Sequence, residues 1–215
     1  MNRVFVCGVG AVSPAGWGVA ELRSALQSEH PLPVQSLPRP GWDSPLATRS
    51  VPPPPTRPAF LAHPRFRRAS PITHYSVAAA LEAIGGDAAR ITRGELRLGI
   101  VTCTMTGGIS YSRRFYQEVL QNPATASPMI FPETVFNSAA SHLAALLGCT
   151  GVNNTFVGDA GTFLQGLTVA AGWLDDRSAD ACVVIGAEER IGPPPMPSVC
   201  LIKRPFTPPA RVPCI

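Results

Sequence analysis

The chain has 215 residues, of which 45% are hydrophobic, enough to bury one sizeable core, so we expect a single domain spanning 1–215. Its formal net charge of +4 is mild, and its arginine groups contain few interleaved aromatic residues, which disfavours a nucleic-acid-binding surface. No stretch approaches 18 uninterrupted apolar residues, so no membrane-spanning helix is expected.

Six cysteines occur without a Cys-x-x-Cys pair and without a histidine at metal-ligand spacing, so no metal site is predicted. Cys7, Cys103 and Cys182 lie in apolar, strand-like segments, where we expect buried, reduced thiols. Reduced thiols indicate a cytoplasmic protein. The apolar stretch after Arg3 is interrupted by glycines and a proline, which argues against a signal peptide.

The N-terminal segment predicts a strand over 3–9 and a short helix over 19–26. The intervening Gly8-x-Gly10-x-x-Ser13 spacing is partly like a dinucleotide-binding turn. Because a serine replaces the third glycine and Pro14 interrupts the expected helix start, we predict an ordinary turn and no cofactor.

Twelve of the 24 prolines lie in the segment 31–71. Proline fixes φ and lacks an N–H donor, so this segment should be neither sheet interior nor helix. We expect a long surface excursion, which is either a poorly ordered loop or a segment draped over its own domain or a partner. A second proline-rich segment, 190–215, predicts an irregular tail.

The middle of the chain predicts an amphipathic helix over 72–84, followed by a strand over 96–103 that is apolar on both faces. Two more helices are predicted over 109–120 and 133–147. The second is rich in alanine and contains His142, a lone histidine that is more typical of a packed or exposed position than of catalysis.

The segment 151–189 predicts a strand over 152–157, a turn at Gly158-Asp159-Ala160-Gly161, a helix over 163–174 and a strand over 179–185. The helix is apolar nearly all round, so we expect it to be buried between layers. The turn places a side chain at a helix N-terminus, where backbone N–H groups and the helix dipole favour an anion. Nucleophile elbows use this position.

Several stretches resemble, in the right order, the N-terminal half of the β-ketoacyl synthases of the thiolase superfamily. They are VFVCGVGAVSPAGWGVAELRSAL at 4–26, PRFRRASPITHYSVAAALEAI at 64–84, LRLGIVTCTMTGG at 96–108, TVFNSAASHLAALLGCTGVN at 134–153, the elbow turn, and Arg204-Pro205-Phe206. The resemblance implies an α/β fold, namely the three-layer α-β-α half of a thiolase-like fold with a mostly parallel central sheet. The family's activating histidines and lysine belong to its C-terminal half, before which this chain ends.

At the elbow, the position of the family's nucleophilic cysteine falls on Asp159 or Ala160, and neither residue can form an acyl thioester. No confident catalytic residue is therefore predicted. The resemblance implies that the acyl substrate is bordered by two short segments. They are Met105, Thr106, Gly107 and Gly108 after a strand, and Gly161, Thr162 and Phe163 after the elbow.

Three functions stay open. The first is a non-catalytic subunit of fatty-acid or polyketide-type biosynthesis, similar to a chain-length factor, that shapes or supports an active ketosynthase. The second is an enzyme that transfers acyl groups or decarboxylates them, using Asp159 as an acid or base. The third is an inactive, truncated remnant. Asp159 also has an ordinary structural interpretation, because aspartate is a common helix N-cap.

Half of such a fold exposes the apolar layer that normally meets the other half, so we expect a homodimer or a heterodimer with a complete ketosynthase. In the family, the strand before the elbow pairs antiparallel with its twin, which predicts an interface along 152–157. The resemblance also makes an acyl carrier protein a possible partner. Its acidic surface would suit the exposed arginines, which are Arg65, Arg67, Arg68, Arg113 and Arg114.

Overall fold

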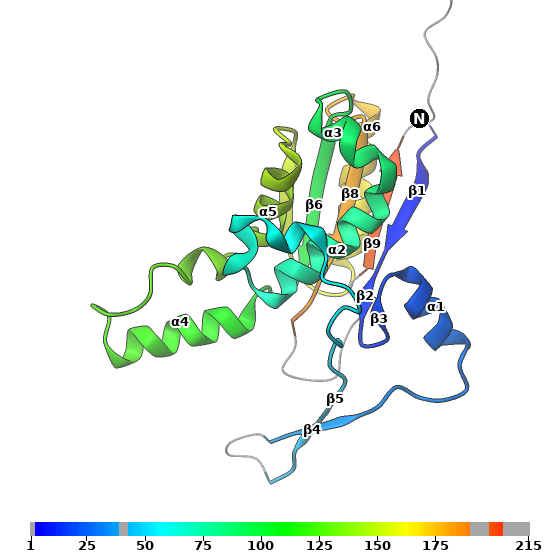
Figure 1. Cartoon of the computed structure of the whole chain (residues 1–215). Helices are drawn as coiled ribbons and strands as arrows, with labels where there is room; N and C mark the ends of the chain where they lie inside the picture. Colours follow the sequence, from blue (N-terminus) through cyan, green and yellow to red (C-terminus); the bar gives the residue numbers. More distant parts are fainter. Residues whose placement is uncertain (1–2, 39–42, 190–197, 204–215) are drawn as a thin grey trace, which may run out of the picture.

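A computed structural model describes residues 3–38, 43–189 and 198–203 of the chain. These residues form a five-stranded sheet with helices on both faces (Figure 1). The strand order is β1-β9-β8-β6-β7. The strands are β1 (Phe5–Gly10), β6 (Leu98–Thr104), β7 (Asn153–Val157), β8 (Ala181–Gly186) and β9 (Ser198–Lys203).

Four of the five strands run in the same direction. β6 pairs parallel with both β7 and β8, whereas β9 lies antiparallel between β8 and β1. β6 is buried along its whole length and β8 along nearly all of it, as expected for central strands that are apolar on both faces. The predicted α/β fold with a mostly parallel sheet is confirmed.

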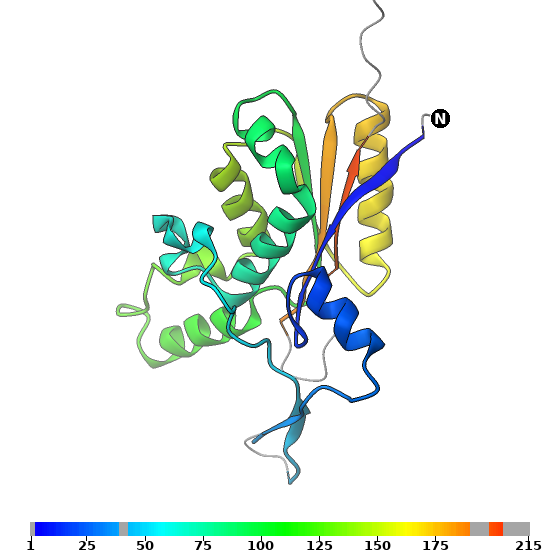
Figure 2. The same ribbon diagram turned by 45° about the vertical axis from the view of Figure 1, so that its right-hand side comes forward.

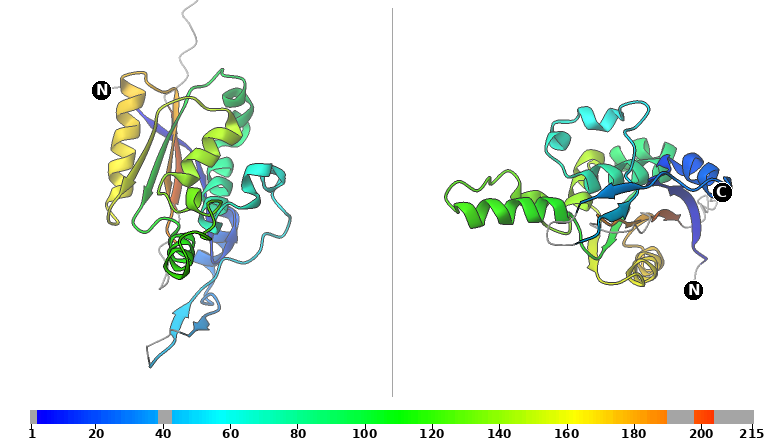
Figure 3. Two further views of the ribbon diagram at one scale, coloured as in Figure 1. Left: turned by 90° about the vertical axis from the view of Figure 1, so that its left-hand side faces the viewer. Right: turned by 90° about the horizontal axis from the view of Figure 1, so that it is seen from below.

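Helices on the two faces of the sheet give three layers. α2 (Pro71–Ile84) and α5 (Ser138–Leu147) cover one face, together with the short α3 (Ala88–Thr92). α6 (Thr162–Asp175) covers the other face (Figures 2 and 3). A separate apolar core fills each side of the sheet.

Gly8 and Gly10 of β1 have a packing role. A Cβ atom at Gly8 would lie 2.0 Å from the backbone oxygen of Ala83, and one at Gly10 would lie 1.9 Å from that of Ala79. Only glycine therefore lets β1 approach α2 this closely. This contact explains the glycine spacing without a nucleotide.

The prediction of a buried thiol is wrong for Cys7. The pairing of β1 with β9 shifts register between Val6 and Gly8, which leaves Cys7 in a β-bulge on the edge strand of the sheet, and its side chain is exposed. Cys103 and Cys182 are buried in the core, as predicted.

The proline-rich segment 31–71 is partly draped over its own domain. Its first half contains a two-stranded ribbon of β4 (Gln35–Leu37) and β5 (Leu46–Thr48), which projects from the body (Figure 1). Its second half contains the 3-10 helices η1 (Ala59–Ala62) and η2 (Pro64–Arg67). Phe66 of η2 is only 2% exposed, and Trp17 Nε1 donates to Pro52 O at 2.8 Å. Trp17 ends a small hairpin of β2 (Val12–Ser13) and β3 (Gly16–Trp17), which precedes α1 (Val19–Gln27).

The helix predicted over 133–147 begins only at Ser138. Glu133 instead lies in the 3-10 helix η4 (Phe131–Glu133), where its buried side chain bonds to other segments. Before it, α4 (Ile109–Gln121) projects away from the sheet (Figure 1), and none of its residues is buried. Arg113 and Arg114 of α4 are exposed, as predicted.

The expectation that α6 is buried between layers is wrong for the isolated chain. Its buried residues, Thr162, Gly166, Ala170 and Leu174, recur every four positions on the face against the sheet. Leu164 is 67% exposed, because α6 is the outermost layer of the described chain on its side of the sheet. The outer face of α6 is therefore open and of mixed polarity, and its exposed residues are Leu164, Gln165, Thr168, Gly172 and Asp175.

The predicted irregular tail contains a strand. Residues 198–203 form β9, whereas 190–197 and 204–215, including Arg204-Pro205-Phe206, lie outside the described residues. Within the described part of the chain, no helix is long and apolar enough to cross a membrane.

Candidate functional site

The elbow lies at the edge of the sheet where the parallel strands β6, β7 and β8 end. β7 stops at Val157, α6 starts at Thr162, and Gly158 N–H donates to Thr104 O of β6 at 3.1 Å. A Cβ atom at Gly158 would lie 2.4 Å from Thr162 Oγ1, so a larger residue in this sharp turn would force the Thr162 hydroxyl to move. Ligands of open α/β sheets commonly bind at this carboxyl edge.

Asp159 holds the turn rather than capping the helix. Its Oδ1 accepts from Gly161 N–H at 2.8 Å, and its backbone oxygen accepts from Thr162 N–H at 3.0 Å. The N-cap of α6 is Gly161, which has no side chain. The N-cap interpretation of Asp159 is therefore corrected to a turn bond two residues before the helix. Ala160 offers only a methyl group.

A cavity of about 300 Å³, here called the elbow cavity, opens beside this turn. It brings together the predicted positions Asp159 and Ala160 with Thr162 and Phe163 from the start of α6. Met105, Thr106, Gly107, Gly108 and Gly161 are not among the residues that line it. The described residues that line it are Cys103, Thr104, Asp159, Ala160, Thr162, Phe163, Leu164, Gly186, Ala187 and Glu188.

Cys103 is the only thiol among these lining residues, and it is poorly suited to replace the missing nucleophile. Burial raises the pKa of the Cys103 thiol to about 11, so it is protonated at neutral pH. Its sulfur also packs closely on α6, since a Cβ atom at Gly166 would lie 2.5 Å from Cys103 Sγ.

Glu188 and Glu189, which follow β8, position the loop after β6. The Glu188 carboxylate accepts from Met105 N–H, from Thr106 N–H at 3.0 Å and from Thr106 Oγ1 at 2.7 Å. Glu189 Oε2 accepts from Ser110 N–H at 3.1 Å, in the first turn of α4. Neither residue was among the predicted site residues, although two acids just after a buried strand are a usable signal.

A second, smaller cavity of about 20 Å³ lies behind the loop after β6. Gly107 and Gly108 line this inner cavity, which shares Cys103, Thr104 and Ala187 with the elbow cavity. The loop residues predicted to border substrate are thus separated into two groups. The glycines face the inner cavity, and the backbone of Met105 and Thr106 is fixed by Glu188.

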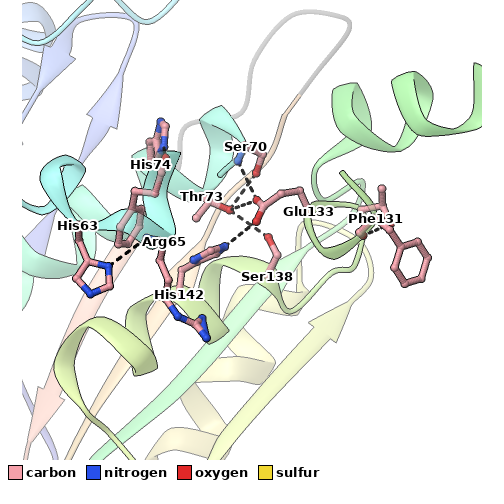
Figure 4. Close-up of polar contacts among 11 residues, drawn as sticks. His63, Arg65, Ser70, Thr73, His74, Phe131, Glu133, Ser138 and His142 are labelled. Atoms are coloured by element: carbon pink, nitrogen blue, oxygen red, sulfur yellow. Dashed lines mark hydrogen bonds and ion pairs between the residues drawn. The ribbon is translucent and has the colours of Figure 1, made fainter. Parts of the chain in front are cut away.

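A buried polar cluster surrounds the side chain of Glu133 (Figure 4), and the Glu133 backbone lies against Gly108 of the same loop. Glu133 is 4% exposed, and its Oε2 accepts from Ser70 N–H at 2.8 Å. His142 Nε2 lies 2.6 Å from Glu133 Oε1 and is the donor, because an ionised carboxylate only accepts. The hydroxyls of Ser70, Thr73 and Ser138 continue the cluster, at 2.9 and 3.1 Å from one another.

Burial alone would raise the pKa of the Glu133 carboxyl, but the hydrogen bonds from His142 and Ser70 outweigh it and hold the pKa below its usual range. The backbone oxygen of Glu133 lies 2.8 Å from the place that a Cβ atom of Gly108 would occupy. His142 packs against Phe66, with ring centroids 5.4 Å apart. His142 does not line the elbow cavity.

The described residues contain no group of three histidine, cysteine, aspartate or glutamate side chains that could hold a metal ion.

Asp159→Asn should leave stability close to that of the original chain, because the asparagine oxygen can accept the same hydrogen bond from Gly161. Asp159→Ala should lower the free energy of unfolding by about 0.5–1 kcal/mol, the usual contribution of one such bond. Urea unfolding of the three proteins measures both effects. Equal stability of the alanine variant would mean that the carboxylate does not hold the turn.

Comparisons with known proteins agree with this arrangement. The sequence profile described as "Beta-ketoacyl synthase, N-terminal domain" matches residues 1–207. Among solved structures, the chain is similar to "The ishigamide ketosynthase/chain length factor", with a TM-score of 0.74 and 18% identity over 94% of this chain and 62% of that one. No curated protein matches the sequence.

Two further structures are similar. One is a type II polyketide synthase acyl-carrier protein in complex with its ketosynthase bound to the hexaketide, with a TM-score of 0.71, 16% identity and coverage of 95% of this chain and 63% of that one. The other is a ketosynthase in complex with its chain length factor from Xenorhabdus doucetiae, with a TM-score of 0.66, 16% identity and coverage of 95% and 80%.

The chain spans 62% and 63% of the first two of these structures. At identities below 20%, structural similarity establishes the fold, which is thiolase-like, as predicted. The family follows from the sequence profile, which covers nearly the whole chain. The chain belongs to the β-ketoacyl synthase N-terminal domain family.

Proposed function

We propose that this chain is a ketosynthase-like subunit of fatty-acid or polyketide-type biosynthesis that forms no acyl-enzyme itself and supports a complete ketosynthase. One observation carries the proposal. The elbow cavity is built at the carboxyl edge of the sheet, but the elbow positions hold Asp159 and Ala160. Neither side chain can form a thioester, and the thiol of Cys103 stays protonated at neutral pH.

The similar structures favour a role as a non-catalytic subunit that accompanies a ketosynthase. Two of them are ketosynthases described together with a chain length factor. A subunit of this kind can have the cavity and the partner-binding surface of a ketosynthase without forming an acyl-enzyme. In this chain, the elbow cavity would form part of the wall around an acyl chain held by the partner.

The proposed contact with the partner runs along β7, which lies at the edge of the described sheet. Ile100 N–H donates to Val152 O at 2.9 Å, and Gly158 N–H donates to Thr104 O at 3.1 Å. Since backbone groups alternate in direction along a strand, Asn153, Thr155 and Val157 direct theirs away from β6. This edge can pair antiparallel with the same strand of a complete ketosynthase, or with that of a second copy.

The open face of α6 adds one exposed apolar side chain, Leu164, to this partner region. An acyl carrier protein is a further possible partner, since one similar structure contains a ketosynthase with its acyl-carrier protein. The exposed Arg113 and Arg114 of α4 would suit an acidic surface. The free thiols of Cys7, Cys103 and Cys149 support a cytoplasmic location.

An enzyme that uses Asp159 is the second candidate, because this carboxylate lines the elbow cavity. Turnover of an acyl carrier substrate by the purified protein, abolished by Asp159→Asn without loss of the fold, would favour it over the first.

Purified protein incubated with an acyl thioester should gain no stable acyl adduct on residues 158–162, because no thiol stands at the elbow. Intact-mass and peptide mass spectrometry measure this directly. An adduct mapped to that peptide would overturn the non-catalytic proposal. Labelling of the exposed Cys7 would show only ordinary thiol reactivity.

Co-purification from the native cell tests the partner. We expect a complete ketosynthase to accompany the chain, identified by mass spectrometry. Recovery of the chain alone, as a monomer, would contradict a supporting role.

A further inference from the structure

The elbow cavity has an unbalanced set of charges. Asp159 and Glu188 both line it, and none of the described residues in its lining is an arginine, lysine or histidine. A cavity that receives an anionic group normally presents a cation or free backbone N–H groups to it. This cavity presents carboxylates.

Three of the backbone donors at the turn and the start of α6 are already occupied. Gly161 N–H bonds to the Asp159 carboxylate, and Thr162 N–H bonds to the Asp159 backbone oxygen. Leu164 N–H bonds to Gly161 O at 3.0 Å. An anionic ligand that used Gly161 N–H would therefore have to displace the carboxylate of Asp159.

Glu188 is fixed in place. Its carboxylate accepts from the backbone of Met105 and Thr106 and from the Thr106 hydroxyl, so moving it away would leave three donors without their acceptor. The second negative charge at the cavity is thus a permanent part of its wall.

We propose, on the basis of the function proposed above, that Asp159 and Glu188 determine specificity by excluding acyl groups that carry a free carboxylate. The elbow cavity then admits a neutral acyl chain carried on a pantetheine thioester and rejects a dicarboxylic one such as malonyl. Like charges in a partly enclosed site repel more strongly than in bulk water. Exclusion by repulsion is an ordinary route to specificity.

Two pantetheine thioesters of nearly identical shape test this. Acetoacetyl-pantetheine carries a methyl group where malonyl-pantetheine carries a carboxylate oxygen. Binding of each to the protein, in the assembly in which it purifies, can be measured by ligand-observed NMR titration. We expect malonyl to bind at least tenfold more weakly than acetoacetyl, and the difference to shrink when salt rises from 20 to 500 mM.

Asp159→Asn is the sharpest variant, because it removes the charge and keeps the turn bond to Gly161. It should tighten malonyl binding severalfold and leave acetoacetyl binding within twofold, and adding Glu188→Gln should extend the gain. Glu29→Gln, which removes one charge at an exposed position outside the cavity lining, is the matched control and should change neither affinity.

The outcomes separate the two proposals. Equal or tighter binding of malonyl by the original protein would overturn the charge exclusion and leave the supporting subunit intact. Malonyl affinity unchanged in Asp159→Asn would also overturn it. Binding of neither thioester would remove the acyl-cavity role itself, and the charge exclusion with it.

Discussion

Replacing Glu133 by alanine should lower the free energy of unfolding by about 3 kcal/mol or more. The side chain is buried where η4, α5 and the start of α2 meet, and its carboxylate serves Ser70, Thr73 and His142 together. Alanine would leave several buried donors without a partner and would leave a cavity behind them. For a chain of this length, the melting temperature should fall by about 6–12 °C.

Urea and thermal unfolding measure this loss. Glu133→Gln should recover part of it, because the amide keeps the volume and one acceptor oxygen. Glu95→Gln is the control at an exposed ion pair with Arg93, and it should leave the free energy of unfolding nearly unchanged. A Glu133→Ala protein as stable as this control would show that the cluster does not hold the three segments together.

The same carboxyl makes stability depend on pH. Its folded pKa is lower than its unfolded pKa, so its stabilising contribution is complete above the ordinary glutamate value of about 4.3. The contribution is lost as the pH falls through the folded pKa. Between pH 6 and pH 3, the original protein should therefore lose more stability than Glu133→Gln does.

Val157→Pro should separate the proposed dimer. The backbone of Val157 faces away from β6, and its side chain is 52% exposed, so the chain itself tolerates proline at this edge. In a two-fold pairing of two copies, each copy loses the backbone N–H donor of residue 157. Each copy also gains a proline ring that blocks the approach of the partner strand. For two copies of this chain, two lost bonds of about 1 kcal/mol each should raise the dissociation constant about thirtyfold. For a pair with a complete ketosynthase, one bond is lost and the rise should be about fivefold.

Sedimentation of the purified assembly measures this change. Val157→Ala keeps the N–H group and should leave the assembly intact. Phe156→Pro instead removes a donor directed at β6 and should destabilise the chain itself. If Val157→Pro and Val157→Ala associate equally well, the interface lies elsewhere.

The periodic elements were predictable because each has a local signal. β6 is apolar on both faces, and α2 and α6 show helical spacing that ends at glycine or at polar residues. β9 was not predicted, because its six residues are flanked by proline-rich sequence, and their strand conformation depends on pairing with β1 and β8. The late start of α5 was missed because Glu133 is held by residues far away in the sequence.

The candidate site was predictable only where the chain bends sharply. Gly158 to Gly161 indicated the elbow, since a strand and a helix meet there within four residues. Glu188 could not be predicted as a site residue, because its carboxylate accepts hydrogen bonds from a loop that lies more than 80 positions earlier in the sequence. The exposure of α6 was also unpredictable from its composition, which is that of a helix covered on both sides.

The place of β9 has a consequence for the order in which the chain acquires its structure. β1 is made first, yet its only strand partner in the described sheet is β9, with Phe5 opposite Lys203. On the ribosome, β1 can dock early against α2 through Gly8 and Gly10, but its ladder must wait for almost the whole chain. Closing so long a loop is slow, so the sheet should complete its folding only after synthesis has passed β9. Until then β1 and β8 both present unpaired edges, which makes this interval the one in which a chaperone matters most.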